Sequence, residues 1–188
     1  MNERKIDEAN ELLILVDEND NELGLLDKVL AHQKGILHRA FSVFIFNSMG
    51  YVILQRRAMD KYHSPGLWSN TCCSHPRQAE PTPEACSRRL VEEMGLTCNL
   101  NFAFTFTYRA EFENGLIEHE FDHVYFGKSD KIPKPNPQEV MDWKYISINE
   151  LKQDILDHPE IYTEWLKICL PKVLQHIGII KNDIYIQK

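Results

Sequence analysis

Apolar residues along the chain follow two spacings, one typical of strands and one typical of helices. The strand type is a short apolar or alternating run rich in Val, Ile, Phe, Tyr and Thr. It occurs six times, at residues 12–16, 40–47, 51–56, 100–110, 116–126 and 143–148. Ser48-Met49-Gly50 predicts a hairpin between the second and third runs, and Asn114-Gly115 predicts a turn between the fourth and fifth. Alternation in the fourth run predicts one shared, half-buried face for Leu100, Phe102, Phe104, Phe106 and Tyr108.

Helical spacing marks two segments in the first half of the chain. Residues 25–34 are weakly helical, and a stronger helix is expected to end before a Gly95 stop. Thr82-Pro83-Glu84 supplies the start of this second helix as an N-cap, a first-turn proline and a first-turn acid.

Two more helices are expected near the C-terminus. Asn149 is expected to cap the first, whose apolar face carries Leu151, Ile155 and Leu156. A final amphipathic helix is expected over about residues 160–177.

Two stretches show neither spacing and are expected to be loops. Residues 58–82 form a long irregular segment, and loops of that length are usually functional. Three prolines, at 133, 135 and 137, mark a surface loop. Strands joined by turns, one central helix and terminal helices predict an α/β (α+β) protein with an α/β/α sandwich around a mixed β-sheet. The 188 residues suit a single domain over 1–188.

Composition and charge narrow the class of protein. With a net charge of -7, a broad nucleic-acid surface is not expected, because phosphate binding of that kind needs a basic stripe. The five cysteines form no even framework, which fits a reducing compartment. The charged N-terminus is not a signal peptide, and no apolar run approaches the roughly 20 residues of a membrane helix. We therefore expect a cytoplasmic protein.

The first candidate for chemistry is a thiol beside an imidazole. Cys73 and His75 lie two residues apart in a polar, proline-bounded loop, so they can point to one side together. A single cysteine is more often a small buried hydrophobe. A thiol near a cation has a lowered pKa, and on that basis Cys73 is expected to serve as an acid or base.

The second candidate is a pair of carboxylates. Glu118 and Glu120 share one face of a predicted strand, where they repel each other unless a cation or a proton lies between them. The alternative is an exposed edge strand whose charges serve solubility. His119 and His123 fall on the opposite face, and no role is assigned to them.

The third candidate is a metal-ligating set of imidazoles and carboxylates. His32 and His38 lie on either side of Gly35, and each alone is more often structural than a ligand. Together with the candidates above they supply three imidazoles and two carboxylates, a nitrogen and oxygen set that suits a divalent Mn, Mg or Zn-type ion. Basic residues at a strand end, among them Arg57 and Lys61, are either solvated cations or a clamp for a diphosphate.

The central helix carries Arg88, Arg89, Glu92 and Glu93, which by themselves are typical of a solvated face with weak ion pairs. With the preceding loop, however, the segment resembles the Nudix box. Its matching positions are Glu80, Arg88, Leu90, Glu92, Glu93, Gly95 and Leu96. Ser74 stands where the box has glycine, and Arg89 stands where it has glutamate. The missing carboxylate argues against hydrolysis of a pyrophosphate.

These residues together resemble type I isopentenyl diphosphate isomerase, a Nudix-fold enzyme whose members also lack the glutamate at the position of Arg89. The resemblance runs from about Leu12 to the last helix. It rests on Leu30-Ala31-His32, Leu37-His38-Arg39-Ala40-Phe41-Ser42, Arg56-Arg57-Ala58, Pro65-Gly66-Leu67-Trp68-Ser69-Asn70, Cys73-Ser74-His75-Pro76, Glu92-Glu93-Met94-Gly95, Tyr108-Arg109-Ala110, Glu118-His119-Glu120 and Glu139-Val140. It implies a Nudix-like fold and the metal-assisted interconversion of isopentenyl and dimethylallyl diphosphate in isoprenoid biosynthesis.

The resemblance also implies roles for particular residues. Cys73 and Glu120 would be the acid–base pair, Tyr108 would assist Glu120, and Trp165 would face the reacting carbons. A divalent ion, Mn²⁺, Mg²⁺ or Zn²⁺, would be held by His32, His38, His75, Glu118 and Glu120. A Mg²⁺ bridging to the diphosphate would be bound by Glu93 and the backbone carbonyl of Cys73. The diphosphate would contact Lys28, Arg57, Lys61 and Arg89.

The implied partner is a small-molecule substrate, isopentenyl diphosphate, with no nucleic acid and no membrane, for a monomer or weak homodimer. The six-residue spacing of His32 and His38 departs from many bacterial members, in which the two lie one residue further apart. Two other functions stay open. A Nudix hydrolase of a nucleoside or other diphosphate would need the carboxylate that Arg89 replaces. A non-enzymatic metal- or partner-binding domain would tolerate replacement of Cys73 and Glu120.

Overall fold

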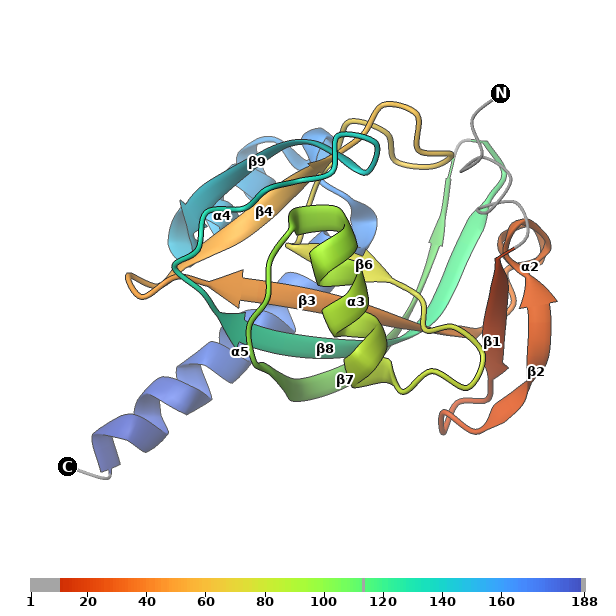
Figure 1. Ribbon diagram of the computed structural model, residues 1–188, viewed down its shortest axis with the longest axis horizontal. Coiled ribbons are helices and arrows are strands. Elements are labelled where there is room, and N and C mark those ends of the chain that lie inside the picture. The colour runs from red at the N-terminus through yellow and green to blue at the C-terminus, as the bar shows by residue number, and fades with distance from the viewer. Residues whose placement is uncertain (1–10, 113, 187–188) are drawn as a thin grey trace.

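The computed structural model describes residues 11–112 and 114–186, with the side chains of the last helix described as far as Gly178. Within these residues nine strands are present: β1 (Leu12–Val16), β2 (Glu22–Asp27), β3 (His38–Phe46), β4 (Tyr51–Arg57), β5 (Trp68–Ser69), β6 (Cys72–Ser74), β7 (Leu100–Glu111), β8 (Ile117–Lys128) and β9 (Val140–Ser147). The helices are α2 (Lys28–Lys34), α3 (Thr82–Met94), α4 (Ile148–Asp157) and α5 (Glu164–Ile186), with a 3₁₀ turn, η1 (Pro159–Ile161), before α5 (Figure 1).

All of these strands belong to one mixed sheet, with β3 near its centre. β3 runs parallel to β8, from His38 beside Glu120 to Phe46 beside Lys128. β1, β4 and β6 pair with β3 in antiparallel fashion, as β7 does with β8 and β9 with β4. The predicted hairpin forms between β3 and β4, where Phe46 pairs with Val52. The prediction of a mixed sheet is confirmed.

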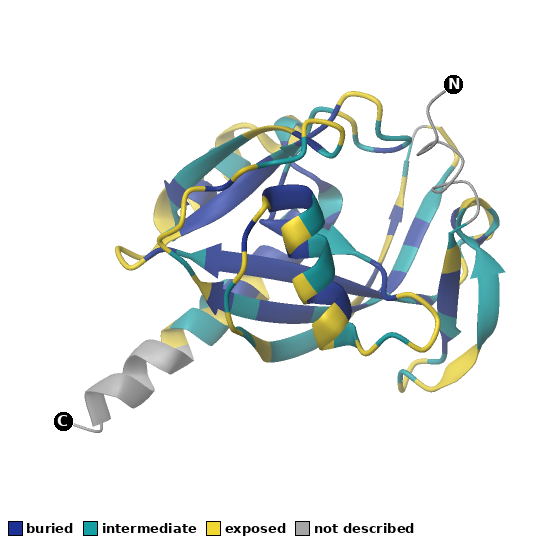
Figure 2. Cartoon of the chain, viewed as in Figure 1, coloured by how far each residue is buried: buried dark blue, intermediate teal, exposed yellow. Residues whose placement is uncertain are grey.

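Side chains alternate along β3 and bury both faces of the sheet. Phe41, Val43 and Ile45 belong to the core beneath α3, together with Leu90 of that helix. Phe44, between them in sequence, belongs to the core beneath α5. Period-two alternation places neighbouring residues on opposite faces, so a nearly continuous apolar run is what a strand covered on both sides requires. With α3 on one face and α4 and α5 on the other (Figures 1 and 2), the α/β/α sandwich is confirmed.

A bulge in β7 corrects the prediction that its apolar residues share one face. The pairing with β8 shifts between Phe102 and Phe104. One extra residue reverses the side to which the following side chains point. Leu100 therefore packs on the α3 side, whereas Phe104, Phe106 and Tyr108 pack on the α5 side. Phe102 lies between the two groups and is 57% exposed.

The predicted helix over 25–34 is partly wrong. Residues 25–27 complete β2, which pairs with β1, and the helix begins only at Lys28. The Asp27 side chain accepts a hydrogen bond from the backbone N–H of Leu30 (2.9 Å) and so caps α2.

Two predicted N-caps are also wrong. At α3 the N-cap is Pro81, so Thr82 lies in the first turn and caps nothing with its side chain. At α4 the N-cap is Ser147, which forms a reciprocal capping box with Glu150. That box satisfies two backbone donors at once, whereas a cap at Asn149 would satisfy one. The predicted Gly95 stop is confirmed, in the left-handed conformation with φ of 62°.

The C-terminal helix and the long loop also differ from expectation. α5 begins at Glu164 because η1 occupies residues 159–161, and it continues to Ile186 rather than ending near 177. The predicted loop over 58–82 contains β5 and β6, and β6 places Cys73 beside Ser42 of β3. Among the described helices, none has both the length and the apolar character needed to cross a membrane.

Candidate active site

A cavity of about 670 Å³ is lined by residues of β1, α2, β3, β4, β6, α3, β7, β8 and α5 and of the loop between β4 and β5. Nearly every residue with a predicted site role lines it: Lys28, Arg57, Lys61, Cys73, His75, Arg89, Glu93, Tyr108, Glu118, Glu120 and Trp165. The two exceptions are His32 and His38, which are almost fully buried, at 1% and 0% exposure. Segments far apart in the sequence therefore meet in one hollow.

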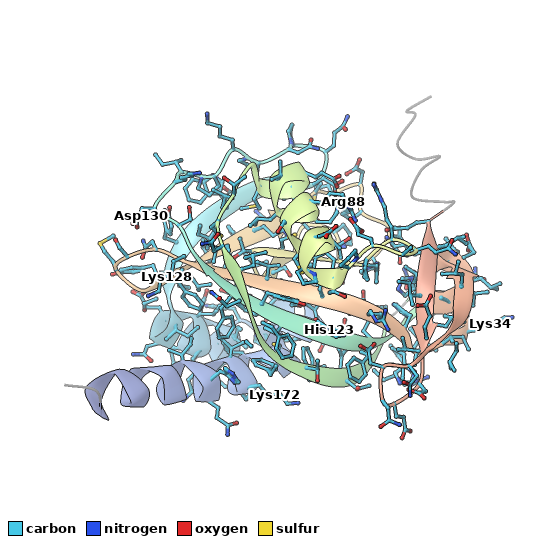
Figure 3. All side chains as sticks on the ribbon, turned by 60° about the horizontal axis from the view of Figure 1, so that its bottom comes forward. Lys34, Arg88, His123, Lys128, Asp130 and Lys172 are labelled. Carbon is cyan, nitrogen blue, oxygen red and sulfur yellow. The ribbon has the colours of Figure 1, made fainter. Side chains whose placement is uncertain are left out.

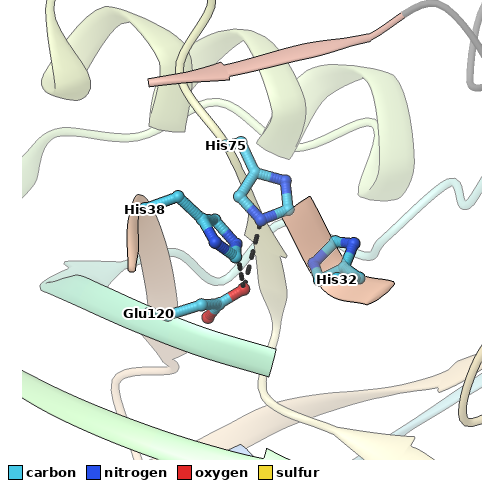
Figure 4. A group of neighbouring side chains, drawn as sticks. All are labelled: His32, His38, His75 and Glu120. Carbon is cyan, nitrogen blue, oxygen red and sulfur yellow. Dashed lines mark hydrogen bonds and ion pairs between the residues drawn. The ribbon is translucent and has the colours of Figure 1, made fainter. Parts of the chain in front are cut away.

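Three imidazoles and one carboxylate form a compact cluster (Figure 4). One ligand atom each from His32, His38, His75 and Glu120 lies within 4.8 Å of the others. Strand pairing produces this convergence, because the parallel register sets His38 of β3 directly beside Glu120 of β8. Gly35 ends α2 in the left-handed conformation (φ 62°), and the turn brings His32 back over His38 in spite of their short spacing.

The nitrogen atoms of this cluster fit a divalent metal ion. His38 Nδ1 donates to the carbonyl of Ile36 (2.8 Å), so its Nε2 carries the free lone pair. Nε2 of His32 and of His38 are buried without a hydrogen-bond partner among the described residues. Burial, with the neighbouring His75 and His38, lowers the pKa of His32 to about 3. Neutral imidazoles with free, buried lone pairs beside a carboxylate are the donor set of a divalent transition metal.

Tyr108 lies between the two carboxylates of β8. Its hydroxyl is 2.8 Å from Glu118 Oε2 and 2.7 Å from Glu120 Oε2. Burial and the nearby Glu120 raise the pKa of Glu118 far above its usual range. Burial also opposes ionisation of Glu120, but the neighbouring imidazoles of His38 and His75 hold its pKa well below that range. A phenol has one hydrogen, so it donates to one carboxyl group at a time, and Glu120, whose pKa is held low, is the stronger acceptor.

Cys73 corrects one expectation about acidity. Its thiol lies in the cavity wall, 3.9 Å from the Ser69 hydroxyl. Burial raises the pKa of Cys73 to about 12, and the attraction of Arg57 does not reverse this. The predicted lowering of the thiol pKa by a nearby cation is therefore wrong, because the loss of water on burial outweighs the attraction of the Arg57 charge. At neutral pH the thiol keeps its proton.

Trp165 closes one side of the cavity. Its indole Nε1–H donates to the Ser69 hydroxyl (2.9 Å) and to Asn70 Oδ1 (3.2 Å), which fixes the ring plane. The guanidinium of Arg57 lies 5.2 Å from the centre of the ring. The ring of Trp165 thus already makes one cation–π contact.

The four predicted diphosphate ligands lie around the cavity, each with an oxygen partner. Lys28 pairs with Glu11 (2.6 Å), and Arg57 donates to two loop carbonyls. Lys61 and Arg89 both contact Glu139. The rim is therefore a balanced set of cations and carboxylates rather than a bare basic patch.

Glu93 is enclosed by hydrogen-bond donors. Its carboxylate accepts from Gln55 Nε2 (2.8 Å) and from Arg89 Nη2 (2.7 Å), and it is only 4% exposed. Arg88, the neighbour of Arg89 on α3, instead binds Glu80 through two parallel hydrogen bonds of 2.7 and 2.8 Å. Arg88 and Glu80 thus fasten the helix to the preceding loop, while Arg88 also lines the cavity together with Glu92 and Glu93.

The sequence alone did not indicate several residues of the site. Tyr62 and His63 lie in the loop between β4 and β5 and contact His32 and Glu118. Gln55 is buried on β4, where only its polarity within an apolar run could have marked it. His123, which was given no role and is labelled in Figure 3, pairs through Nε2 with Asp20 (2.9 Å).

Known proteins resemble this chain in sequence and in fold. Residues 36–166 match the family model described as NUDIX domain. The isopentenyl-diphosphate Delta-isomerase 2 of Aromatoleum aromaticum is 56% identical over 86% of this chain and 86% of its own length. The isopentenyl-diphosphate Delta-isomerase of Pectobacterium atrosepticum is 50% identical over 91% of this chain and 96% of its own.

Solved structures agree on the fold. The crystal structure of DR0079 from Deinococcus radiodurans superposes with a TM-score of 0.72 at 23% identity, covering 86% of this chain and 98% of that one. A MutT protein from Methanosarcina mazei gives 0.60 at 17% identity, covering 72% and 91%. At these identities the likeness concerns the fold alone. The matched domain and the high identity to named isomerases together show that the chain belongs to the isopentenyl-diphosphate Delta-isomerases of the Nudix family.

Proposed function

We propose that the protein interconverts isopentenyl diphosphate and dimethylallyl diphosphate by adding a proton to one carbon and removing a proton from another. The observation that carries the proposal is the 50–56% identity to enzymes named for this activity over most of both chains. The cavity supports it, because it brings a protonated thiol, an ionised carboxylate and an aromatic ring into one space. The substrate alkene is unactivated. Its protonation gives a tertiary carbocation.

Cys73 and Glu120 are the proposed acid–base pair. They come from β6 and β8, and both line the cavity, which lets them reach different carbons of one bound substrate. Tyr108 donates its hydroxyl hydrogen to Glu120 and so keeps that carboxylate oriented. Trp165 lines the cavity, and its aromatic ring is suited to stabilising positive charge at the reacting carbons.

His32, His38, His75, Glu118 and Glu120 are the proposed ligands of a divalent ion, Mn²⁺, Mg²⁺ or Zn²⁺. Such an ion, when bound, supplies positive charge that fixes the Glu120 carboxylate and tunes its acidity. The free, buried Nε2 atoms of His32 and His38 support this assignment. Glu118 lies outside the compact four-ligand cluster and reaches it through Tyr108, so its ligand role requires a small change of side-chain position.

The diphosphate is proposed to bind at the rim, with Mg²⁺ held by Glu93 and the carbonyl of Cys73. Lys28, Arg57, Lys61 and Arg89 would then hydrogen-bond to the phosphate oxygens. Two of them, Lys61 and Arg89, share Glu139 in the free protein. When the substrate binds, Lys61 and Arg89 therefore exchange a carboxylate partner for phosphate oxygens. Their side chains are already ordered before the substrate arrives.

The protein is proposed to act in the cytoplasm, as a monomer or weak homodimer. All five cysteines are free thiols, which fits a reducing compartment. Gel filtration with light scattering, run over a range of concentrations, tests the assembly state.

Incubation with isopentenyl diphosphate and Mg²⁺ in D₂O, followed by NMR, tests the reaction. The expected result is deuterium in dimethylallyl diphosphate with no release of phosphate. Release of phosphate or a monophosphate without isomerisation would overturn the proposal in favour of a Nudix hydrolase. Arg89, which stands where that activity needs a carboxylate, favours the isomerase.

A further inference from the structure

Two neighbouring residues of the loop between β4 and β5 contact the metal-ligating side of the cavity. The hydroxyl of Tyr62 is 2.5 Å from Nδ1 of His32. Nε2 of His63 is 3.3 Å from Oε1 of Glu118. Neither contact follows from the Nudix box, because the loop lies outside it.

The Tyr62 contact decides which nitrogen of His32 faces the cluster. A metal-binding imidazole presents a lone pair on one nitrogen and carries hydrogen on the other. His32 belongs to the four-ligand cluster, and its Nε2 is buried without a partner among the described residues. Nδ1 is therefore the nitrogen that carries hydrogen, and the Tyr62 oxygen is the acceptor that holds it there.

The ring of His63 is also fixed by its neighbours. Its ring stacks on Phe112 with an interplanar angle of 25° and meets Trp165 edge to face at 78°. It is 8% exposed, and its Nδ1 has no partner among the described residues, so the polar contact of the ring is the one to Glu118. A carboxyl oxygen accepts hydrogen, so this contact favours the tautomer of His63 that carries its hydrogen on Nε2.

The backbone of this loop is anchored by the residue that precedes it. Arg57 donates from Nη2 to the carbonyl of His63 (3.1 Å) and from Nε to the carbonyl of Ser64 (3.2 Å). Asn114 Nδ2 donates to the carbonyl of Tyr62 (3.4 Å). The two side chains are thus presented from a fixed backbone, so their contacts constrain the residues they touch.

We propose that Tyr62 and His63 are positioning residues, which hold the imidazole of His32 and the carboxylate of Glu118 in the orientations that bind a divalent ion. The proposal rests on the proposed function only for its effect on turnover, since metal binding can be measured without substrate. Outer hydrogen bonds of this kind change metal affinity by about 10–100-fold.

Tyr62→Phe tests the first contact, because it removes the acceptor and keeps the ring. Metal-free protein is titrated with Mn²⁺, and free Mn²⁺ is followed by electron paramagnetic resonance. We expect binding weaker by about 10–100-fold. Tyr125→Phe is the matched control, a buried tyrosine in the core beneath α3, and should bind as the wild type does. Equal affinity of Tyr62→Phe and wild type would remove Tyr62 from the proposal.

His63→Leu and His63→Gln test the second contact. Both fill much of the space, but only the glutamine amide can donate to Glu118. The visible spectrum of the Co²⁺-loaded protein reports ligand geometry. We expect the leucine variant to shift it and the glutamine variant to restore it, with kcat following the same order and KM changing less. Equal spectra for wild type and His63→Leu would show that the imidazole only fills space. Equal shifts in both variants would show that donation to Glu118 is not its role.

The two proposals fail separately. If the wild type binds metal but does not isomerise, the proposed function is wrong, while the Mn²⁺ and Co²⁺ measurements still decide the roles of Tyr62 and His63. If isomerisation is normal and the variants bind metal like the wild type, only the positioning proposal falls.

Discussion

Cys73 and Glu120 begin from opposite protonation states. Burial raises the pKa of the thiol to about 12, so it carries a proton at neutral pH. Burial also works against ionisation of Glu120, yet the neighbouring imidazoles of His38 and His75 lower its pKa enough to keep it charged. One donor and one acceptor are therefore present together in the free protein, which a double-bond shift needs.

Replacing Cys73 by alanine is expected to separate chemistry from metal binding. The side chain is the proposed acid or base, whereas the proposed Mg²⁺ ligand at this position is the backbone carbonyl, which alanine keeps. Deuterium incorporation from D₂O should fall by at least about 100-fold, with the metal content unchanged by elemental analysis. Cys98→Ala, a partly buried thiol outside the cavity, is the control and should keep full activity. Retained deuterium incorporation in Cys73→Ala would exclude the thiol as the acid or base.

Side chains in regular strands were easier to predict than side chains in loops. Alternation placed Glu118 and Glu120 on one face, and the structure has them there, bridged by Tyr108. Tyr62 and His63 lie in an irregular segment, where no period says which way a side chain points. The acidity of Cys73 was predicted with the wrong sign, because burial depends on neighbours that are distant in sequence.

At the scale of elements, the spacing of apolar residues located the strands but not their ends. The β7 bulge reverses the facing of the residues after Phe102, and nothing in an unbroken alternation of aromatic residues announces it. Two residues near the start of α4, Ser147 and Asn149, are of types that favour an N-cap. Ser147 wins over Asn149 because Glu150, three residues after it, completes the capping box.

The link between Glu80 and Arg88 fastens the loop before α3 to that helix, and it should depend on pH. The hydrogen bonds from the Arg88 guanidinium hold the pKa of Glu80 below its usual range. A lowered folded-state pKa gives stability that is complete above the unfolded value and is lost as the pH falls through the folded one. Glu80→Gln should therefore lower the free energy of unfolding by about 1 kcal/mol at pH 7.

The difference between Glu80→Gln and wild type should shrink as the pH falls below about 4.5. Urea unfolding followed by circular dichroism at several pH values measures it. Glu18→Gln, an exposed carboxylate in the turn after β1, is the control and should change little. A difference that stays constant down to pH 3 would mean that the ionised pair is not its source.

At the scale of the whole molecule, the site exists because strands distant in sequence pair with one another. The parallel register of β3 and β8 joins His38 to Glu120, and the antiparallel pairing of β6 with β3 carries Cys73 and His75 to the same region. Spacing alone cannot specify such pairings, since they are set by burial on both faces of the sheet. The convergence of these segments was implied by resemblance to a family and is explained by the sheet.

Removal of metal should therefore weaken the whole fold and not the site alone. The cluster joins α2, β3, β8 and the segment after β6, and its imidazoles and carboxylate lie buried together. An ion that binds only the folded state, at 100 times its dissociation constant, stabilises it by about 2.7 kcal/mol. For a chain of this size that corresponds to a rise in Tm of about 5–10 °C.

We expect chelation to lower Tm by that amount and resupply of metal to restore it, as measured by thermal scans at fixed protein concentration. Glu120→Gln should abolish most of the metal-dependent shift, because an amide replaces the one carboxylate of the cluster. Glu80→Gln makes the same chemical change away from the cavity and should keep the full shift. A metal-dependent shift that survived in Glu120→Gln would place the stabilising ion elsewhere, and the four-residue cluster would then hold the elements together by packing alone.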